Sequence, residues 1–174
     1  MCKKFANLAK KIEKFANYEE EPMIAPVLSS DQVPPHIVVD TNVLIGALLG
    51  SEGANRRILR ACFEGKLAPI MGQALLSEYE DVMSRSNLFS NCPLSSSERA
   101  AFLDDFLSVC AWVSIYFGWR PNLRDEADNH VLELAIAGNA SAVITNNVKD
   151  FQFAELHFPD ILILSPKQAG KRFL

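Results

Sequence analysis

The chain has 174 residues, of which 49% are hydrophobic and 22% are charged, and its formal net charge is -4. This composition suits one globular domain and excludes a fibrous or disordered protein. The longest apolar runs fall far short of the ~20 residues that a membrane-spanning helix needs, and no signal-peptide pattern opens the sequence, so we expect a cytoplasmic protein. The four cysteines lack paired spacing and nearby histidines, which disfavours a zinc site or a disulfide framework.

The first 35 residues differ in pattern from the remainder. Residues 3–16 place apolar side chains at helical spacing among five lysines, which predicts a basic amphipathic helix. The following segment loses this periodicity and gains prolines, as a linker does. We therefore predict two parts: an N-terminal helix and linker at residues 1–35, and a domain at residues 36–174. The preferred interpretation of the N-terminal helix is that it covers an apolar patch of its own domain.

From His36 onwards, segments of strand type alternate with segments of helix type. The predicted strands are residues 36–39, 66–72, 141–146 and 160–166, and the predicted helices are residues 42–49, 54–65, 73–86, 94–113 and 127–138. Ser95 and Glu98 have the spacing of a capping box. This alternation predicts an α/β fold, a three-layer α/β/α sandwich around a mostly parallel sheet of four or five strands.

Several polar residues are expected at one edge of this sheet, because ligands of open α/β sheets bind outside the carboxyl ends of the strands. Asp40 ends the first strand, and Thr145 to Asn147 end a later one. Glu78 and Asp128, on neighbouring helices, can reach the same edge, and Asp150 follows shortly after. Carboxylates gathered in this way repel each other, a cost that a divalent cation would remove.

Each of these residues also has an ordinary structural explanation. Asp40 can serve as the N-cap of the next helix, and Glu78 can be a solvated helix carboxylate. Asp125 and Asp128 lie where the dipole of a helix N-terminus favours acids. Asn147 and Asp150 suit a turn. Their joint placement, and not any single residue, favours a functional site.

Three segments in series carry a family resemblance: "VVDTNVLIGALL", "LLSEYEDVM" and "RDEADNHVLELAIAGNASAVITNNVKDF". In order and spacing they resemble the PIN-domain family of metal-dependent nucleases, and within it the toxin-like group related to VapC. The resemblance extends over roughly residues 36–166 and is strong only when the three segments are taken together. It implies a PIN-like fold, a ribonuclease activity and the role of toxin in a toxin-antitoxin pair.

The resemblance also implies roles for individual residues. Asp40, Glu78 and Asp128 match the family's metal-binding acids, with Asn42 and Thr145 in supporting positions. Asn147 stands where the family often has a fourth acid, which puts a second metal position in question. Asp150 is the candidate that replaces this acid, and it completes the predicted catalytic and metal-binding set. Asp125 remains an alternative to Asp128.

Oxygen ligands of this kind suit Mg²⁺ or Mn²⁺. The resemblance implies attack by water on RNA, which leaves a 5′-phosphate. Candidates for contacts with flanking phosphates are Arg56, Arg57, Arg60 and Lys149, for which a solvated helix face is an equally good explanation. Trp112 and Trp119 could stack on bases, but packing in the core or in a lid is the preferred interpretation. The implied partners are an RNA substrate, a cognate antitoxin and a second copy of the chain.

Two other functions compete with the nuclease. A phosphatase of the haloacid-dehalogenase type also has an aspartate after its first strand, but it needs a second aspartate where this chain has Asn42. The other candidate is a PIN scaffold that binds RNA or protein without catalysis, and Asn147 is the feature in its favour. Cleavage of RNA that depends on a divalent ion separates these two from a nuclease.

Overall fold

Five short strands form one parallel sheet in the computed structural model, which describes residues 33–50, 53–116, 123, 128–151 and 158–174. The strands are β1 (His36–Val39), β2 (Ala68–Met71), β3 (Ala111–Trp112), β4 (Ala142–Ile144) and β5 (Leu162–Leu164). Their order across the sheet is β3-β2-β1-β4-β5, and every neighbouring pair is parallel. The strand β1 is thus central, with Ile37 opposite Pro69 of β2 and Val38 opposite Val143 of β4.

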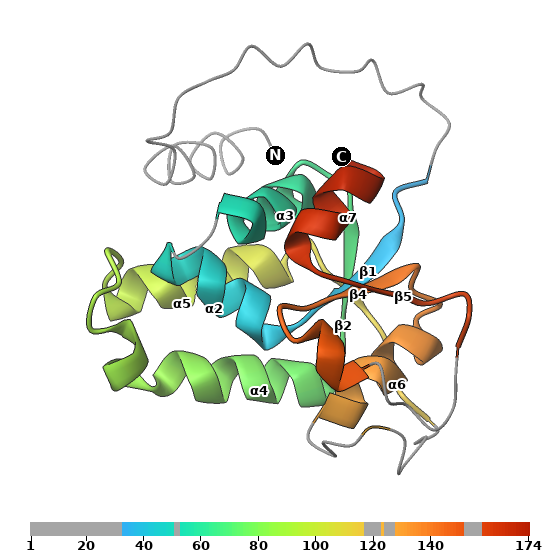
Figure 1. The fold of residues 1–174 in the computed structure, drawn as a ribbon. Helices are drawn as coiled ribbons and strands as arrows, with labels where there is room; N and C mark the ends of the chain where they lie inside the picture. Colours follow the sequence, from blue (N-terminus) through green and yellow to red (C-terminus); the bar gives the residue numbers. More distant parts are fainter. Residues whose placement is uncertain (1–32, 51–52, 117–122, 124–127, 152–157) are drawn as a thin grey trace. The chain divides into compact units, whose positions relative to one another are not determined.

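The central strands are apolar on both faces. Ile37 and Val38 of β1 are completely buried, as are all three residues of β4. Their β-branched side chains favour the extended backbone, and a parallel sheet with two apolar faces needs cover on both. Helices supply this cover, with α3 and α7 on one side of the sheet and α6 on the other (Figure 1). The predicted three-layer α/β/α fold is confirmed.

Six α-helices flank the sheet in the described part of the chain: α2 (Thr41–Leu49), α3 (Gly53–Phe63), α4 (Gln73–Ser84), α5 (Ser96–Leu107), α6 (Asn129–Ala137) and α7 (Pro166–Phe173). Two 3₁₀ helices, η1 (Ser86–Phe89) and η3 (Val148–Phe151), lie between them along the chain. The predicted capping box is present, since Ser95 and Glu98 bond to each other's backbone N–H groups at the start of α5. The helix α2 ends at Gly50, whose φ of 74° is the left-handed conformation that glycine adopts without strain.

One buried tyrosine fastens α4 to the end of β1. The Tyr79 hydroxyl donates a hydrogen bond of 2.6 Å to the carbonyl of Val39, and the residue is fully buried. Its ring lies beside Phe106 of α5, which makes an edge-to-face contact with Phe63 of α3. Because Tyr79 is fixed, its neighbour Glu78 is held close to the carboxyl end of the central strand.

Two predicted elements differ from the structure. The helix predicted for residues 94–113 ends at Leu107, and Ala111–Trp112 form the edge strand β3 instead. Pairing with β2 explains the change: Ala111 lies opposite Ile70, and Val113 donates a backbone hydrogen bond of 2.9 Å to Met71. The predicted strand at residues 160–166 is shorter and is followed by α7, which the periodicity had not indicated.

The boundary between the two predicted parts, residues 1–35 and 36–174, stays a prediction, because residues 1–32 lie outside the described part. Residues 34–174 form one compact unit. Among the described helices, none combines the length and the apolar composition that crossing a membrane requires.

Candidate functional site

Asp40 lies at the junction of β1 and α2, and its backbone is fixed from both sides. Its N–H donates a hydrogen bond of 2.9 Å to the carbonyl of Ile144 on β4, and its carbonyl accepts from Val43 in the first turn of α2. The residue is the N-cap of α2, where its Oδ1 accepts a bond of 3.4 Å from the N–H of Asn42. The ordinary explanation, a helix cap, therefore describes part of what this carboxylate does.

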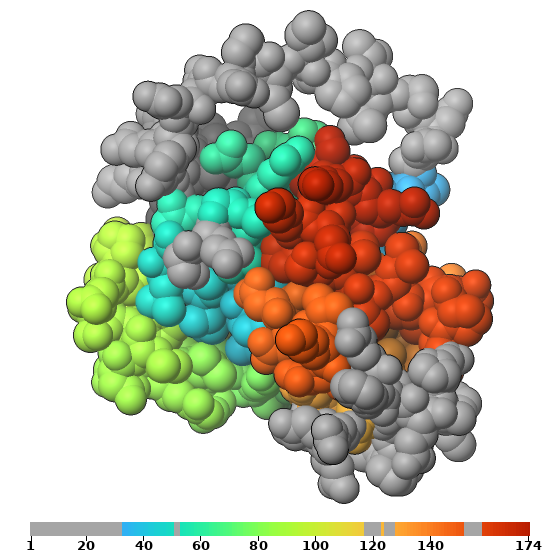
Figure 2. Space-filling model, viewed as in Figure 1, coloured from blue at the N-terminus to red at the C-terminus, as the bar shows by residue number. Residues whose placement is uncertain are grey.

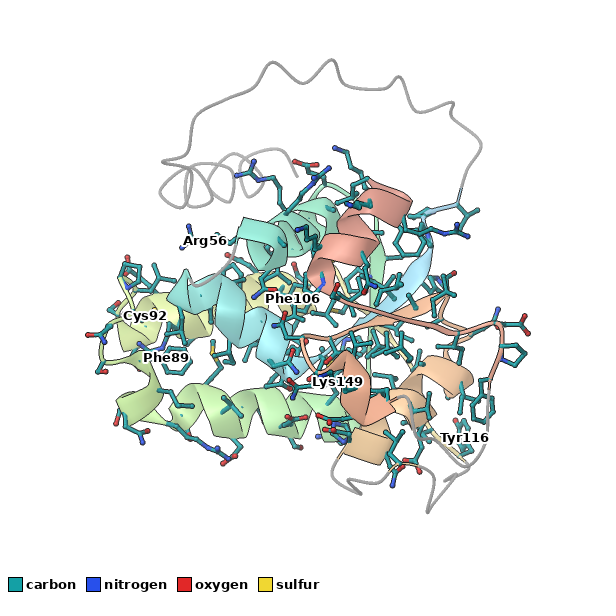
Figure 3. The ribbon with its side chains drawn as sticks, in the orientation of Figure 1. Arg56, Phe89, Cys92, Phe106, Tyr116 and Lys149 are labelled. Carbon is teal, nitrogen blue, oxygen red and sulfur yellow. The ribbon has the colours of Figure 1, made fainter. Side chains whose placement is uncertain are left out.

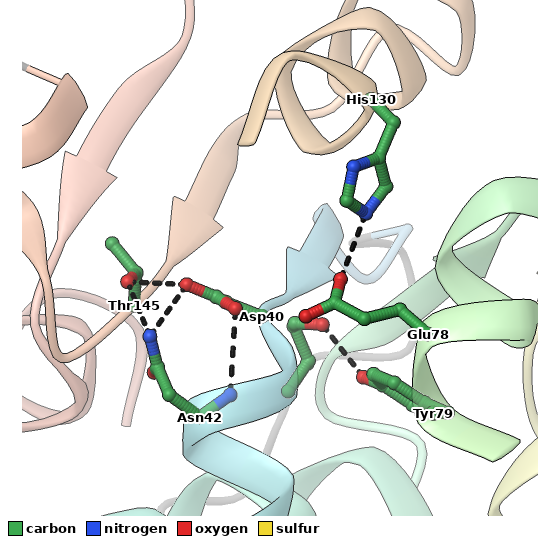
Figure 4. A network of polar contacts seen from close by, with 7 residues as sticks. Asp40, Asn42, Glu78, Tyr79, His130 and Thr145 are labelled. Carbon is green, nitrogen blue, oxygen red and sulfur yellow. Dashed lines mark hydrogen bonds and ion pairs between the residues drawn. The ribbon is translucent and has the colours of Figure 1, made fainter. Parts of the chain in front are cut away.

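The other carboxylate oxygen belongs to a separate network. Asp40 Oδ2 accepts hydrogen bonds from the Thr145 hydroxyl at 2.5 Å and from the Asn42 amide at 2.7 Å (Figure 4). The same amide donates to Thr145 Oγ1 at 3.1 Å. Thr145 is completely buried, and Asp40 is only 6% exposed. The ends of the adjacent strands β1 and β4 are thus joined through side chains as well as through the backbone.

The turn after β4 is held by the same two residues. Asn147 donates its backbone N–H to Thr145 Oγ1 at 2.9 Å, so this hydroxyl donates once and accepts twice, which uses its full capacity. Asn146 donates its backbone N–H to Asn42 Oδ1 at 2.9 Å and its side-chain amide to the Asn42 carbonyl at 3.3 Å. The sequence analysis placed Asn146 at this edge within Thr145 to Asn147 but gave it no role in the site. The sequence feature that could have indicated this role is the pair Asn146–Asn147 after β4, which faces the "DTN" that follows the adjacent strand β1.

The environment of Asp40 disfavours its charged form. Burial raises the pKa of the Asp40 carboxyl above its ordinary value, and the nearby charge of Glu78 raises it further. The hydrogen bonds from Thr145 and Asn42 lower this pKa but do not cancel the effect of burial. An ionised Asp40 beside Glu78 is therefore a partly uncompensated charge, which a cation would stabilise.

Glu78 projects from α4 toward α6, where it meets a histidine. His130 Nε2 lies 2.9 Å from Glu78 Oε2, and the two form an ion pair when the imidazole is protonated (Figure 4). The histidine side chain is 12% exposed and that of Glu78 is 37% exposed. His130 was absent from the predicted site, although it stands two residues after Asp128 in the third family-like segment.

The remaining predicted acids in the described part of the chain lie at the start of α6 and on η3. Asp128 is half-buried at the start of α6, while Asp150 and Asn147 are exposed, Asp150 on η3 and Asn147 just before it. Asp125 lies outside the described residues. Within the described ranges, no three His, Cys, Asp or Glu side chains lie close enough together to hold a metal ion. The structure thus brings together Asp40, Asn42, Thr145 and Glu78. The parts of Asp128, Asn147 and Asp150 in the site stay predictions.

The predicted phosphate-binding cations lie on two elements. Arg57 and Arg60 are exposed on α3. Lys149 is exposed on η3 and is labelled in Figure 3. Arg56, also on α3, is half-buried and donates from Nε to the Ala47 carbonyl of α2 at 3.0 Å, which ties these two helices together. Trp112 was interpreted as a core or lid residue, but it is 56% exposed on the edge strand. Trp119 lies outside the described residues.

These features define a class of protein: a parallel α/β domain with an acidic, hydrogen-bonded site at the carboxyl edge of its central strands. The sequence matches the family model of the PIN domain over residues 36–149, more than half of the chain. The chain belongs to the PIN-domain family.

A solved structure agrees with this assignment at the level of the fold. The chain is similar to one in the crystal structure of VapBC2 from Rickettsia felis bound to a DNA fragment from its promoter. The TM-score is 0.52 at 19% sequence identity, and the similarity covers 75% of this chain and 98% of the other. A search of curated proteins gave no match. The predicted membership of the family is confirmed, and the VapC-like resemblance holds for the fold.

Proposed function

We propose that the protein is an endoribonuclease that depends on Mg²⁺ or Mn²⁺, with Asp40 and Glu78 at the centre of its site. The observation that carries the proposal is the buried Asp40 carboxylate, held by Thr145 and Asn42 at the carboxyl edge of the sheet and repelled by Glu78. Membership of the PIN-domain family supports the same activity. Asp128 is proposed as the third ligand, and Asp150 as the weakest member of the set.

The residues present fit a hard divalent cation. Asp40 Oδ2 accepts two short hydrogen bonds, whereas Oδ1 accepts one long bond of 3.4 Å and keeps most of its capacity for a ligand. Mg²⁺ is commonly held by one or two protein carboxylates, and water and substrate phosphate complete its six ligands. The small number of clustered acids is therefore compatible with one ion. A positive charge at this position would also offset the effects that raise the pKa of Asp40.

The chemistry assigned to this site is hydrolysis of a phosphodiester. A bound ion lowers the pKa of water and neutralises charge on the phosphate. The oxygen of water bonds to phosphorus, the bond from phosphorus to the 3′ oxygen breaks, and the products are a 5′-phosphate and a 3′-hydroxyl. The side chains of this protein do the positioning: Thr145 and Asn42 fix the orientation of Asp40, and the fully buried Tyr79 fixes the segment that carries Glu78.

The proposal is tested by digesting a broad panel of RNAs with the purified protein in the presence of Mn²⁺, Mg²⁺ or EDTA. We expect cleavage with either ion, none with EDTA, and 5′-phosphate ends on the products. Cleavage that persists in EDTA would contradict the metal requirement. If no RNA is cut under any of these conditions, the nuclease proposal fails.

The proposed biological role is that of a toxin in a toxin-antitoxin pair. The fold shared with a chain of the VapBC2 structure and the toxin-like sequence segments support this role. The partners would be an RNA substrate, a cognate antitoxin that inhibits the site, and a second copy of the chain in a homodimer. The location would be the cytoplasm, where such an enzyme meets cellular RNA. Co-expression with a neighbouring reading frame that restores growth would test the pairing.

The second candidate is a PIN scaffold that binds RNA or protein without cutting it. The exposed, neutral Asn147 and the small number of clustered acids in the described residues favour this candidate. The two functions differ in one measurement. If the protein is an inactive scaffold, wild type and Asp40→Asn both bind RNA and neither cleaves it with any metal ion. If it is a nuclease, wild type cleaves RNA and Asp40→Asn does not.

A further inference from the structure

Two packed helices concentrate positive charge on a protein that is acidic as a whole. The helices α3 and α7 carry six of the 17 lysines and arginines of the chain and none of its 21 acidic residues. They contact each other and lie side by side on one face (Figures 1 and 2). Of the six cations, five are exposed: Arg57, Arg60, Lys167, Lys171 and Arg172. We call these five residues the α3–α7 basic face.

The two helices present their charges as one surface. The contact runs through Gly170 of α7, since a side chain at this position would meet Cδ and Nε of Arg57 at 4.0 Å. Arg57 of α3 therefore lies over the middle of α7, between Lys167 and Lys171 in the sequence of that helix.

The charges of this face are not neutralised by the acids that the structure describes. Within the described ranges, none of the five cations forms an ion pair. The acid that directly follows α3, Glu64, is paired with Lys66 at 2.8 Å. Exposed cations close together repel one another, so an arrangement of this kind is stabilised by a bound polyanion.

We propose that the α3–α7 basic face binds the phosphate backbone of RNA, as a second contact surface in addition to the acidic site. The face lacks what a protein interface needs: none of the large exposed apolar side chains among the described residues lies on α3 or α7. Protein interfaces have apolar or aromatic residues at their centre, whereas a nucleic-acid backbone is held largely by cations and needs no apolar centre. RNA is thus favoured over an acidic protein segment.

One end of the basic face lies at the same edge of the sheet as the acidic site, so an RNA strand that reached both would run along α7. The helix α7 begins directly after β5, at the same edge of the sheet as Asp40. Thr145, which bonds to Asp40, also donates its N–H to the carbonyl of Leu164 at the end of β5 at 3.0 Å. Lys167, in the first turn of α7, is therefore the member of the face nearest to that edge along the chain. This inference rests on the proposed RNA substrate, but it does not require cleavage.

The test measures binding of a short fluorescein-labelled single-stranded RNA by fluorescence anisotropy in EDTA, over a range of salt concentrations. The variant Arg60→Gln/Lys171→Gln removes two charges from the face. The control Lys66→Gln/Arg85→Gln removes two charges whose partners are Glu64 and Asp81, outside the face. We expect the face variant to bind at least about tenfold more weakly than the control, with a salt slope reduced by roughly 0.7 for each lost phosphate contact.

A second pair, Lys167→Gln/Arg172→Gln, repeats the test in case the first variant is destabilised, and thermal melting confirms that each variant is folded. Equal weakening in the face variants and in the control would overturn the proposal, because it would show an effect of net charge only. Equally tight binding of polyglutamate, lost in the same variants, would assign the face to an acidic protein and overturn the RNA proposal. A protein that binds RNA through this face but does not cut it would refute the nuclease proposal alone.

Discussion

The two oxygens of Asp40 lie in different surroundings, which separates its structural role from its proposed chemical one. Oδ2 accepts the short bonds from Thr145 and Asn42, and Oδ1 accepts only the long bond from the Asn42 N–H. An asparagine can retain the first two bonds with its amide oxygen and loses only the long one. We therefore expect Asp40→Asn to abolish cleavage and to leave the free energy of unfolding in EDTA equal or higher, because an ill-solvated charge is removed. Cleavage assays and thermal unfolding in EDTA check this.

The pH dependence of stability provides a control for the same variant. Because burial raises the pKa of folded Asp40, the folded chain binds more protons than the unfolded chain between the two pKa values. The contribution of this carboxyl to the free energy of unfolding thus falls as pH rises through that interval. The difference in stability between Asp40→Asn and wild type should grow over the same interval. A large loss of stability in the variant at neutral pH would mean that Asp40 is chiefly a helix cap.

Thr145 is the residue on which the network depends most. Thr145→Val keeps the shape of the side chain but removes a hydroxyl that donates to Asp40 and accepts from Asn42 and Asn147. Because the position is completely buried, we expect a loss of about 1–3 kcal/mol in the free energy of unfolding and a fall in cleavage. Urea unfolding measures the first effect. Thr145→Ser, which retains the hydroxyl, should stay close to wild type, and equal losses in both variants would contradict the hydrogen-bond explanation.

Asn147 is the position at which an added charge should strengthen metal binding. Its backbone is fixed to Thr145, so Asn147→Asp places a carboxylate next to the network without altering the turn. We expect this variant to bind Mn²⁺ more tightly and to cleave at lower metal concentrations, as measured by calorimetric titration. An unchanged affinity in Asn147→Asp would show that this turn does not face the ion.

Asp150→Ala should reduce activity less than Asp128→Ala, since Asp150 is exposed on η3.

At the scale of the elements, the end of α6 is packed tightly against the sheet. Gly138 has a φ of -92°, which any residue adopts, but a Cβ there would lie 2.4 Å from Cδ1 of Ile70 and 3.2 Å from Cγ2 of Val113. Ile70 is buried in β2 and has little room to move. Gly138→Ala should therefore destabilise the protein by about 1–3 kcal/mol, the usual cost of overpacking. Chemical denaturation tests this, with Gly53→Ala as the control because a Cβ at Gly53 meets nothing within 4 Å.

The errors in the predicted elements have physical causes. The segment from Ser108 to Trp112 continues an apolar pattern, so periodicity extended the helix, whereas edge pairing with β2 decides its conformation. Propensity cannot represent such tertiary pairing. The helix α7 did have a local signal in the sequence. Ser165 and Gln168 form a capping box, and Pro166 stands at the first position of the helix. The strands HIVV and AVI were predictable because each contains an unbroken apolar run, and the residues of these runs, Ile37–Val39 and Ala142–Ile144, are all buried.

The candidate site was predictable where it follows from sheet topology. The end of β1 and the end of β4 carry Asp40 and Thr145, and adjacent parallel strands bring such residues together. The partnership of Glu78 with His130 was not predictable, because it depends on how α4 and α6 pack.

At the scale of the whole molecule, residues 34–174 form one compact unit, and the site contacts described above lie within it. We expect a protein that lacks residues 1–30 to be folded and to keep the same requirement for Mg²⁺ or Mn²⁺. Thermal unfolding and metal-dependent cleavage of the shortened protein measure this. Insolubility would show that the N-terminal segment belongs to the core, and a rise in activity would show that it inhibits the site.

The hydrogen bond between Thr145 and Asp40 joins residues 105 positions apart, and that between Asn42 and Asn146 joins residues 104 positions apart. During synthesis the ribosome releases Asp40 long before Thr145, and contacts between distant residues form late in folding. The nascent chain therefore carries its acids for most of translation without the neighbours that orient them. Any activity that depends on this network begins only when most of the domain has left the ribosome. Under the proposed ribonuclease activity, an unfinished chain would therefore not cleave the message that encodes it.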